Sequence, residues 1–344
     1  MKKISIIGHF GFGLDLANGQ TIKTKIIYDE LLKTYNDIFT VDAHGGLKAI
    51  VPVIIGCTSS IMKCKNIILM LTENGLKVSV PVLAIINKIY NRKLHYIVIG
   101  GWLPEFLKKQ KILSKLLKKF DYIYVETTTM KKTLEKQGFK NIVVMPNCKD
   151  LKILSESELV YNRQEPLKLC TFSRVMKEKG IEEAIEVVKT INEEKGRKVF
   201  TLDIYGQIDK EQISWFEELR TELPNYITYG GIVPFDDSVK VLKNYYALLF
   251  PTYYDGEGFA GTIIDAYAAG LPVVASDWKY NYEVVDDYKT GLLYSDRNID
   301  EFKTKLYWIY TNQQEWNRMK KNCINKSRKF LTRIVIEILD KRLI

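Results

Sequence analysis

The chain has little of what metal, redox and disulfide chemistry requires. Its 344 residues include only 3 histidines and 5 cysteines. The two nearest cysteines, Cys57 and Cys64, are seven positions apart and the total is odd, so neither a metal-type pair nor a disulfide framework is visible. There is no Asp-x-Asp pair and no His/Cys cluster. We therefore expect reduced cysteines in a cytoplasmic protein, with no bound metal and no cofactor.

Long apolar runs are also absent. The longest uncharged run, residues 49–62, is shorter than the ~20 residues that a membrane-spanning helix needs. No basic, apolar and small-residue signal peptide opens the chain, since residues 4–7 are typical of a short strand. These absences predict a protein that is soluble, or peripheral on the inner face of the cell membrane.

Basic residues outnumber acidic ones, 51 to 41, which gives a net charge of +10. Such an excess suits nucleic acid, anionic lipid or phosphorylated ligands. No helix-turn-helix, zinc-finger or RNA-recognition signature is present, so we do not expect nucleic acid as a partner.

Apolar strands alternate with amphipathic helices in both halves of the chain. Regular alternation of this kind implies parallel sheets covered on both faces. We predict an α/β fold with two Rossmann-like, doubly wound domains facing each other across a cleft, because open α/β sheets bind ligands at the carboxyl ends of their strands. Strands are expected at residues 3–7, 37–41, 67–71, 94–99, 122–126 and 142–145, and again at 167–172, 201–205, 226–229, 247–250, 272–275 and 291–293.

The expected domain boundaries follow from this pattern. Residues 1–150 should form the N-terminal domain, and residues 167–312 the C-terminal one. Between them, residues 151–166 are polar without a core pattern and read as a linker. Residues 313–344 should form a helical segment that can return to the N-terminal domain.

The most informative stretch is residues 251–276, where a loop with two acids and three glycines precedes a small-residue helix. Its glycines, among them Gly258 and Gly261, leave backbone N–H groups uncovered at the helix start, and such groups bind anions and hydroxyls. Glu257 lies in the loop and Asp265 eight positions on, so both acids can face one crevice. The alternative is a surface loop with two solvated acids.

This stretch resembles the donor-site signature of the family-4 retaining glycosyltransferases, which have the GT-B fold. Glu257-Gly258-Phe259 and the run from Ala269 to Ser276 match that signature. Two positions depart from it, because Ala260 replaces a loop glycine and Asp265 stands where the family has a second Glu. The resemblance implies that Glu257 holds the donor sugar and that Asp265 holds the ribose. It also implies that backbone amides around Phe259–Gly261 complete the contacts to the sugar and the phosphate.

Two further motifs support the resemblance. Arg174 and Lys179 precede Gly180 with the family's five-residue spacing, which implies that they neutralise the donor diphosphate, Arg as a fork and Lys as a point charge. The turn Met145-Pro146-Asn147 is similar to the family's Val-Ile-Pro-Asn-Gly, with Cys148 in place of the glycine. The alternative for Arg174 and Lys179 is a basic surface loop.

The N-terminal loop contains Gly8-x-x-Gly11-x-Gly13, which is the reverse of a dinucleotide fingerprint and is not directly followed by a helix. The family's glycine loop is better matched by Gly19 at the first helix, with Gly13 as the alternative contact to the diphosphate. Many family members carry a histidine at the end of a first-domain strand. His95 lies at a strand start instead and should be structural, whereas His9 follows the first strand and can line the cleft.

Residues 106–120 carry six lysines. An apolar stripe of Phe106, Leu113, Leu116, Leu117 and Phe120 predicts one amphipathic helix, and such a helix can lie on anionic lipid. The alternative is a helix that packs its stripe on the sheet and solvates its lysines.

Taken together, the residues and the resemblance predict a retaining, metal-independent glycosyltransferase. Its catalytic residues would be Glu257, Arg174 and Lys179, and its substrate a nucleotide-sugar donor. The first domain would bind a saccharide or lipid-linked acceptor, as in bacterial surface polysaccharide assembly. The alternatives are a nucleotide-sugar epimerase on the same fold and a non-catalytic sugar-binding protein.

Overall fold

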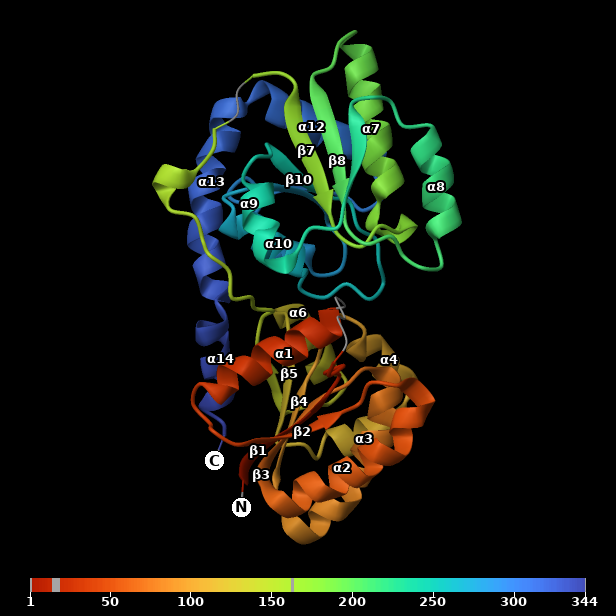
Figure 1. Cartoon of the computed structure of the whole chain (residues 1–344), viewed down its shortest axis with the longest axis vertical. Helices are drawn as coiled ribbons and strands as arrows, with labels where there is room; N and C mark the ends of the chain where they lie inside the picture. Colours follow the sequence, from red (N-terminus) through yellow and green to blue (C-terminus); the bar gives the residue numbers. More distant parts are fainter. Residues whose placement is uncertain (1, 14–18, 162–163, 344) are drawn as a thin grey trace. The chain divides into compact units, whose positions relative to one another are not determined.

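The chain folds into two compact α/β units, each described here by itself (Figure 1). The structure is a computed structural model that describes residues 2–13, 19–161 and 164–343. Unit 1 comprises Met1–Asp150 and Leu331–Ile344, and unit 2 comprises Leu151–Phe330. Each unit contains a six-stranded parallel sheet with helices on both faces, so the predicted α/β fold with two Rossmann-like, doubly wound domains is confirmed.

The sheet of unit 1 has the strand order β2-β1-β3-β4-β5-β6. Its strands are nearly continuous apolar runs, as expected of parallel strands covered on both faces. They are β1 (Lys2–Gly8), β2 (Ile38–Asp42), β3 (Cys64–Met70), β4 (Lys93–Ile97), β5 (Tyr122–Val125) and β6 (Ile142–Val144).

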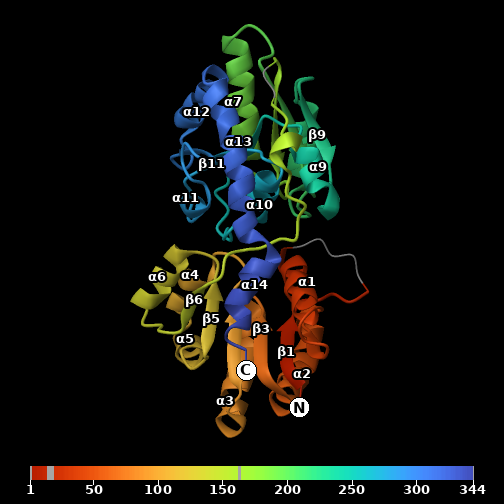
Figure 2. The same ribbon diagram turned by 90° about the vertical axis from the view of Figure 1, so that its left-hand side faces the viewer.

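Helices α2 and α3 pack against each other on the sheet of unit 1, and α3 packs on α5. Helix α1 packs on α14, which the chain contributes after leaving unit 2 (Figure 2). The helices are α1 (Gly19–Leu32), α2 (Ile50–Lys63), α3 (Glu73–Tyr90), α4 (Leu103–Lys109), α5 (Lys111–Leu117), α6 (Thr128–Lys136) and α14 (Thr332–Asp340), and the short η1 (Gly46–Ala49) precedes α2.

The sheet of unit 2 has the order β12-β11-β10-β7-β8-β9. The central strands β10 and β7 each have a neighbouring strand on both sides, and β10 is buried along its whole length. The strands are β7 (Leu167–Phe172), β8 (Phe200–Tyr205), β9 (Ile227–Gly231), β10 (Ala247–Phe250), β11 (Val273–Ser276) and β12 (Gly291–Tyr294).

Alternate residues of these strands enter two apolar cores, one on each face. Leu169 and Leu249 belong to the core that contains the residues of α7, and Cys170 and Leu248 to the core that contains those of α10. The helices are α7 (Ile181–Glu194), α8 (Ile213–Thr221), α9 (Ser238–Leu242), α10 (Gly261–Ala268), α11 (Asn281–Val284), α12 (Ile299–Thr311) and α13 (Gln313–Ser327), with the short η2 (Glu156–Glu158), η3 (Lys177–Lys179), η4 (Phe235–Asp237) and η5 (Arg328–Phe330).

The structure draws the domain boundaries differently from the sequence. Residues 151–166, expected as a linker, belong to unit 2, because Leu154 and Leu159 are buried and the Leu154 amide donates to the carbonyl of Ala268 at 3.0 Å. The C-terminal segment, residues 313–344, is divided between the two units. Helix α13 packs on α10 of unit 2, whereas Val335 and Leu339 of α14 enter the core of unit 1.

The single helix predicted over residues 106–120 is wrong, because the chain forms α4 and α5 with a break at Gln110. At about 100° per residue, one straight helix would place Leu107 and Leu113 on different sides. The non-helical backbone of Gln110 (φ −119°, ψ 66°) lets Leu107, Leu113 and Leu117 all be buried. Phe106, expected in the buried stripe, is only half-buried and packs edge-on against Trp102.

Candidate functional site

The candidate site lies where the winding of the unit 2 sheet reverses. The chain order runs outward in opposite directions from the neighbouring strands β7 and β10, and ligands of doubly wound sheets bind beyond the carboxyl ends of such a strand pair. The loop after β7 carries Arg174 and Lys179, and the loop after β10 carries Glu257. The topology therefore places three sequence-predicted residues on two adjacent loops.

Lys179 and Glu257 form an ion pair. Both side chains are only 11% exposed, although they are 78 positions apart in the sequence. The Lys179 ammonium also lies over the ring of Tyr254, 4.9 Å from its centroid. Low exposure strengthens electrostatic attraction, so this charged pair is a preformed site for groups that carry charge or many hydroxyls.

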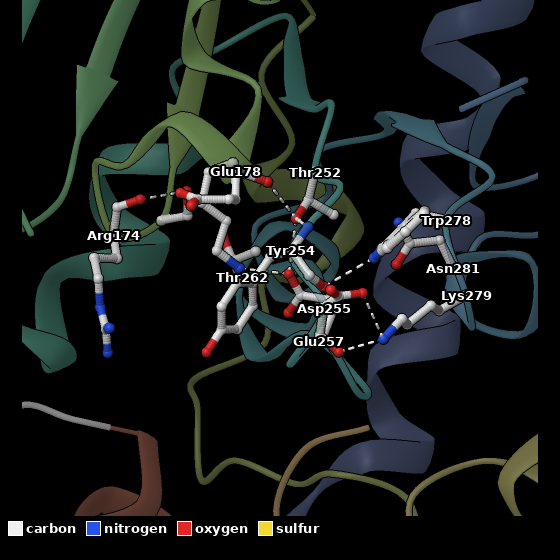
Figure 3. Close-up of polar contacts among 12 residues, drawn as sticks. Arg174, Glu178, Thr252, Tyr254, Asp255, Glu257, Thr262, Trp278, Lys279 and Asn281 are labelled. Carbon is white, nitrogen blue, oxygen red and sulfur yellow. Dashed lines mark hydrogen bonds and ion pairs between the residues drawn. The ribbon is translucent and has the colours of Figure 1, made fainter. Parts of the chain in front are cut away.

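Thr252 fixes the orientation of the Glu257 carboxylate (Figure 3). Its hydroxyl donates to Oε2 of Glu257 at 3.0 Å and accepts from the Tyr254 amide at 3.2 Å. The carbonyl of Glu178 accepts from the amide of Tyr253 at 2.8 Å, which ties the loop after β10 to the loop after β7. Thr252 is not among the sequence-predicted site residues, although its position directly after β10 and beside Pro251 places it at the carboxyl end of a central strand.

Gly180 allows the two loops to approach this closely. It has φ 70° in the left-handed region, and a Cβ atom there would lie 2.2 Å from the carbonyl oxygen of Pro251. Only glycine meets both conditions at low cost. Gly180 thus sets the distance between the Lys179 loop and the Glu257 loop.

A second layer of side chains holds the Glu257 loop from the side of β11. Trp278 donates from Nε1 to the carbonyl of Tyr254 at 2.8 Å, and Lys279 forms an ion pair with Asp255 at 3.2 Å (Figure 3). Ser276 donates to the carbonyl of Thr252 at 2.6 Å. Ser276, Trp278 and Lys279 come after the Gly-Leu-Pro-Val-Val run that matches the family. No sequence pattern predicts that they bond to the Glu257 loop.

Helix α10 begins at the end of the Glu257 loop without a side-chain cap at Ala260. Gly258, Phe259 and Ala260 are buried, and Phe259 packs edge-on against Phe330 at 4.8 Å. Gly261 and Thr262 are half-buried, and the Thr262 hydroxyl donates to the carbonyl of Phe172 at 2.5 Å. A helix start without a side-chain cap is suited to an anion.

Arg174 and Asp265 differ from the buried pair. The Arg174 side chain is 50% exposed and contacts Asp209 at 3.3 Å, so it lies at the rim of the site. Asp265 is only 2% exposed, and Oδ1 accepts from the Ser238 hydroxyl of α9 at 3.1 Å. The crevice that Glu257 and Asp265 are expected to share stays a prediction. Asp265 lies in the second turn of α10, beside Ser238 of α9. Its contact with a ribose stays a prediction.

Gly19 of unit 1, predicted at the donor diphosphate, is exposed at the first residue of α1. A Cβ atom at Gly19 would meet nothing within 4 Å, and the same is true of the alternative contact, Gly13. Asn18, the neighbour in the predicted glycine loop, lies outside the described residues. The roles of Gly19 and Gly13 at a diphosphate stay predictions.

His9 belongs to a polar cluster at the carboxyl ends of β1 and β2. Its Nδ1 lies 2.8 Å from the Thr21 hydroxyl, and its Nε2 lies 2.9 Å from Nδ1 of His44. Asp42 accepts from the amides of Phe10 and His44. Partial burial, and then the neighbouring His44, lower the pKa of His9, which favours the neutral imidazole. This cluster lies at the carboxyl edge of the unit 1 sheet.

Metal ligands do not gather in the described parts of the chain, where no three His, Cys, Asp or Glu residues lie close enough to hold an ion. All five cysteines lie in the described ranges and are buried there as free thiols.

Comparison with known proteins places this geometry in a class. The whole chain superposes on solved structures of the GT-B type. Against Anabaena HepE with bound UDP and glucose the TM-score is 0.73 at 17% identity, covering 100% of this chain and 99% of that one. Against sucrose-phosphate synthase from Thermosynechococcus elongatus it is 0.79 at 15% identity, with 99% and 98% covered. These likenesses establish the fold.

The model of the family described as glycosyl transferases group 1 matches residues 158–329, half of the chain. The chain therefore belongs to that glycosyltransferase family. A relative in Streptococcus gordonii, the GtfA subunit of a UDP-N-acetylglucosamine–peptide N-acetylglucosaminyltransferase, is 28% identical over 58% of this chain and 40% of its own length. An uncharacterised glycosyltransferase of Methanocaldococcus jannaschii is 24% identical over 59% of this chain and 53% of its length. The chain thus aligns with about half or less of these relatives.

Proposed function

We propose that the protein is a retaining glycosyltransferase that moves a sugar from a nucleotide-sugar donor to a saccharide or lipid-linked acceptor. The observation that carries the proposal is the sequestered Lys179–Glu257 pair at the reversal point of the unit 2 sheet, beside the start of α10. A scaffold protein would have no need to keep two charges at 11% exposure on approaching loops. Removing such charges from water costs several kcal/mol per ion.

In the proposed complex the donor diphosphate lies between cations and the start of α10. Lys179 and Arg174 offset the charge that develops on the leaving nucleoside diphosphate, while the amides at Ala260 and Gly261 donate to its oxygens. Arg174 is exposed and can swing from Asp209 to a phosphate, whereas Lys179 is already fixed by Glu257. Leaving-group stabilisation by these groups needs no metal ion.

Glu257 is assigned to the sugar. Its carboxylate is held by Lys179 and Thr252, so its remaining lone pairs can accept from sugar hydroxyls without a change of rotamer. Asp265 is assigned to the ribose and Gly19 to the diphosphate by resemblance to the family. A front-face transfer through an oxocarbenium-like state is proposed, because it requires no protein nucleophile.

The relatives guide the choice of substrates. The pneumococcal GtfA structure holds UDP and GlcNAc, and the HepE structure holds UDP and glucose, so uridine-diphosphate sugars are the proposed donors. An amylovoran biosynthesis glycosyltransferase of Erwinia amylovora is 26% identical over 38% of this chain and 32% of its own length, which supports a saccharide acceptor and a role in polysaccharide assembly. We place the enzyme in the cytoplasm at the inner face of the membrane, with the lysines of residues 106–120 facing anionic lipid.

Slow hydrolysis of donors tests the function directly. The protein is incubated with a panel of nucleotide sugars, with uridine derivatives first, and the products are separated. Release of the nucleoside diphosphate, with the freed sugar retaining its anomeric configuration by NMR, supports the proposal. An isomerised donor would indicate an epimerase, and binding without turnover would indicate a sugar-binding protein.

A further inference from the structure

Helix α2 exposes an apolar side, which is unusual for a helix that covers a sheet. With the preceding η1 it forms an 18-residue element, Gly46–Lys63, whose length and hydropathy would suffice for a membrane span, yet only 28% of it is buried. It nevertheless belongs to the α/β layer. Val53, Cys57 and Ile61 are buried against the sheet, and a Cβ atom at Gly56 would lie 2.4 Å from Val41. One side of α2 therefore packs while the other remains apolar and exposed.

The exposed side of α2 is a continuous stripe. Leu47 is 86% exposed, Val51 64%, Ile55 61% and Met62 53%. Their spacing, with Ile54 and Thr58 between them, follows the three- and four-residue steps of one helix face. A solvated helix face normally carries charged and polar residues. This stripe is therefore suited to an apolar environment.

The neighbouring helix α3 also exposes aliphatic residues. Ile85 and Ile89 are 63% and 82% exposed, and they lie one turn apart on a helix that packs beside α2 (Figure 1). Ile112 of α5, which packs on α3, is exposed as well. We call the set Leu47, Val51, Ile55, Met62, Ile85 and Ile89 the apolar face. The exposed aliphatic residues of unit 2, such as Ile213 and Ile232, belong to no such stripe and need no explanation.

The charge of the protein is concentrated in the same region. Residues 43–120, which contain α2 to α5, hold thirteen Lys and Arg residues and only two acids, Glu73 and Glu105. This segment carries a net charge of +11, while the whole chain carries +10. Lys48, Lys63, Lys77 and Lys88 are exposed on η1, α2 and α3 themselves. The excess positive charge of the protein thus lies in the segment that contains the apolar face, and four of its lysines are exposed on the same helices.

We propose that the apolar face enters the interfacial layer of an anionic bilayer while the surrounding lysines contact lipid headgroups. Aliphatic side chains flanked by lysines are typical of surfaces that lie in the membrane interface, where the basic residues are attracted to anionic lipid. A second copy of the chain is a poorer occupant, because pairing two such faces brings together two cationic surfaces with hardly any acids to offset them.

This inference deepens the membrane part of the proposed function by assigning insertion to α2 and α3, with residues 106–120 giving only electrostatic attraction. The test is co-sedimentation of the full chain with vesicles of phosphatidylcholine alone or of phosphatidylcholine mixed with phosphatidylglycerol, whose negative surface potential attracts basic segments. The variant V51Q/I55Q/I85Q/I89Q should lower the partition constant more than tenfold on anionic vesicles. The matched control, I213Q/I232Q on unit 2, should stay within about twofold of wild type.

A fluorescence probe separates insertion from surface attraction. Because the five native cysteines are buried, an I55C variant can be labelled selectively with an environment-sensitive dye. Anionic vesicles should shift its emission to the blue, whereas the same dye on I232C should not respond. Changing Lys108, Lys109, Lys115 and Lys118 to Gln should weaken binding at low salt and leave the residual bound fraction blue-shifted.

Either of two sedimentation results would overturn the inference: wild type does not pellet with anionic vesicles at low salt, or V51Q/I55Q/I85Q/I89Q pellets as much as wild type. A wild-type dimer in light scattering that V51Q/I55Q/I85Q/I89Q abolishes would also overturn it, in favour of a second copy of the chain. Donor hydrolysis measured without vesicles keeps the two proposals distinguishable. Hydrolysis without membrane binding removes only the present inference, and membrane binding without hydrolysis removes only the proposed transfer.

Discussion

Lys179 and Glu257 depend on each other as well as on the substrate. Each is 11% exposed, so either side chain left alone would be a largely buried, uncompensated charge. Breaking a buried pair by removing one partner costs about 3–5 kcal/mol, whereas neutralising both costs much less. Single substitutions at these positions therefore mix a loss of binding with a loss of loop stability, and stability should be measured beside each binding constant.

We predict that R174A and K179A each weaken nucleoside-diphosphate binding, by about 1.5–3 kcal/mol, which is the scale of a charge-assisted hydrogen bond. Arg174, half exposed at the rim, should fall at the lower end, and Lys179, sequestered beside Glu257, at the upper end. Calorimetric titration with UDP measures both. The matched control is R220A, which removes a similarly exposed arginine on α8 that pairs with Glu217. Affinity unchanged in both variants would remove the diphosphate role.

Glu257 and Asp265 should respond in opposite ways. E257Q is expected to reduce transfer or donor hydrolysis at least a hundredfold while leaving UDP affinity within a few-fold, because the lost charge contacts the sugar. D265A should instead weaken UDP itself. Since Asp265 also accepts from Ser238 inside the fold, S238A serves as the control for a structural effect. Identical kinetic and binding profiles for E257Q and D265A would contradict the division of roles.

At the scale of elements, β4 contains a pH-sensitive position. His95 is fully buried, with Nδ1 3.1 Å from the Tyr124 hydroxyl and Nε2 3.3 Å from Asn66. Burial lowers the pKa of His95 to about 4, with Asp121 opposing this shift and Lys93 and Arg342 adding to it. As expected for a structural histidine, it is neutral in the folded state.

The low pKa of His95 makes unit 1 less stable at acidic pH. Below an unfolded pKa of about 6.5 the unfolded chain takes up a proton that the folded chain refuses until about pH 4, so stability is lost as pH falls through that window. We predict that the free energy of unfolding of unit 1 drops by about 2 kcal/mol between pH 7 and pH 5. Denaturant titrations of wild type and H95Q measure it; an equal drop in H95Q would assign the effect to other groups.

The sequence could predict the strands but not all of the helices. Strands such as β7 and β10 are short apolar runs between turn residues, and both were placed at their observed bounds. Helices α2 and α3 have no predicted range, because the outward side of α2 is largely apolar and α3 exposes Ile85 and Ile89 beside its lysines. Pro81 inside α3 weakens the signal further. The contact between Lys179 and Glu257 was also beyond reach, since it depends on which strands become neighbours.

For the whole molecule, we expect sugar transfer to proceed without a bound metal ion. No described cluster of acids or histidines is arranged to hold an ion, and Arg174, Lys179 and the start of α10 already supply positive charge. We predict that donor hydrolysis keeps most of its rate, within about twofold, after dialysis against EDTA. Rates are compared with and without added Mg²⁺ or Mn²⁺. Activity abolished by the chelator and restored by a divalent ion would contradict a metal-independent transfer.

The division of the chain between its two units also has a consequence for biosynthesis. Unit 2 is a single continuous stretch, Leu151–Phe330, whereas unit 1 needs α14, which is translated after all of unit 2. The residues of α14 that enter the core of unit 1, including Val335 and Leu339, therefore leave the ribosome after all of unit 2. Although synthesis of unit 1 begins first, unit 2 is the first unit whose residues have all been synthesised. The surface of α1 that packs on α14 lacks its partner until then. Unit 1 can thus complete its core only after unit 2 has been synthesised.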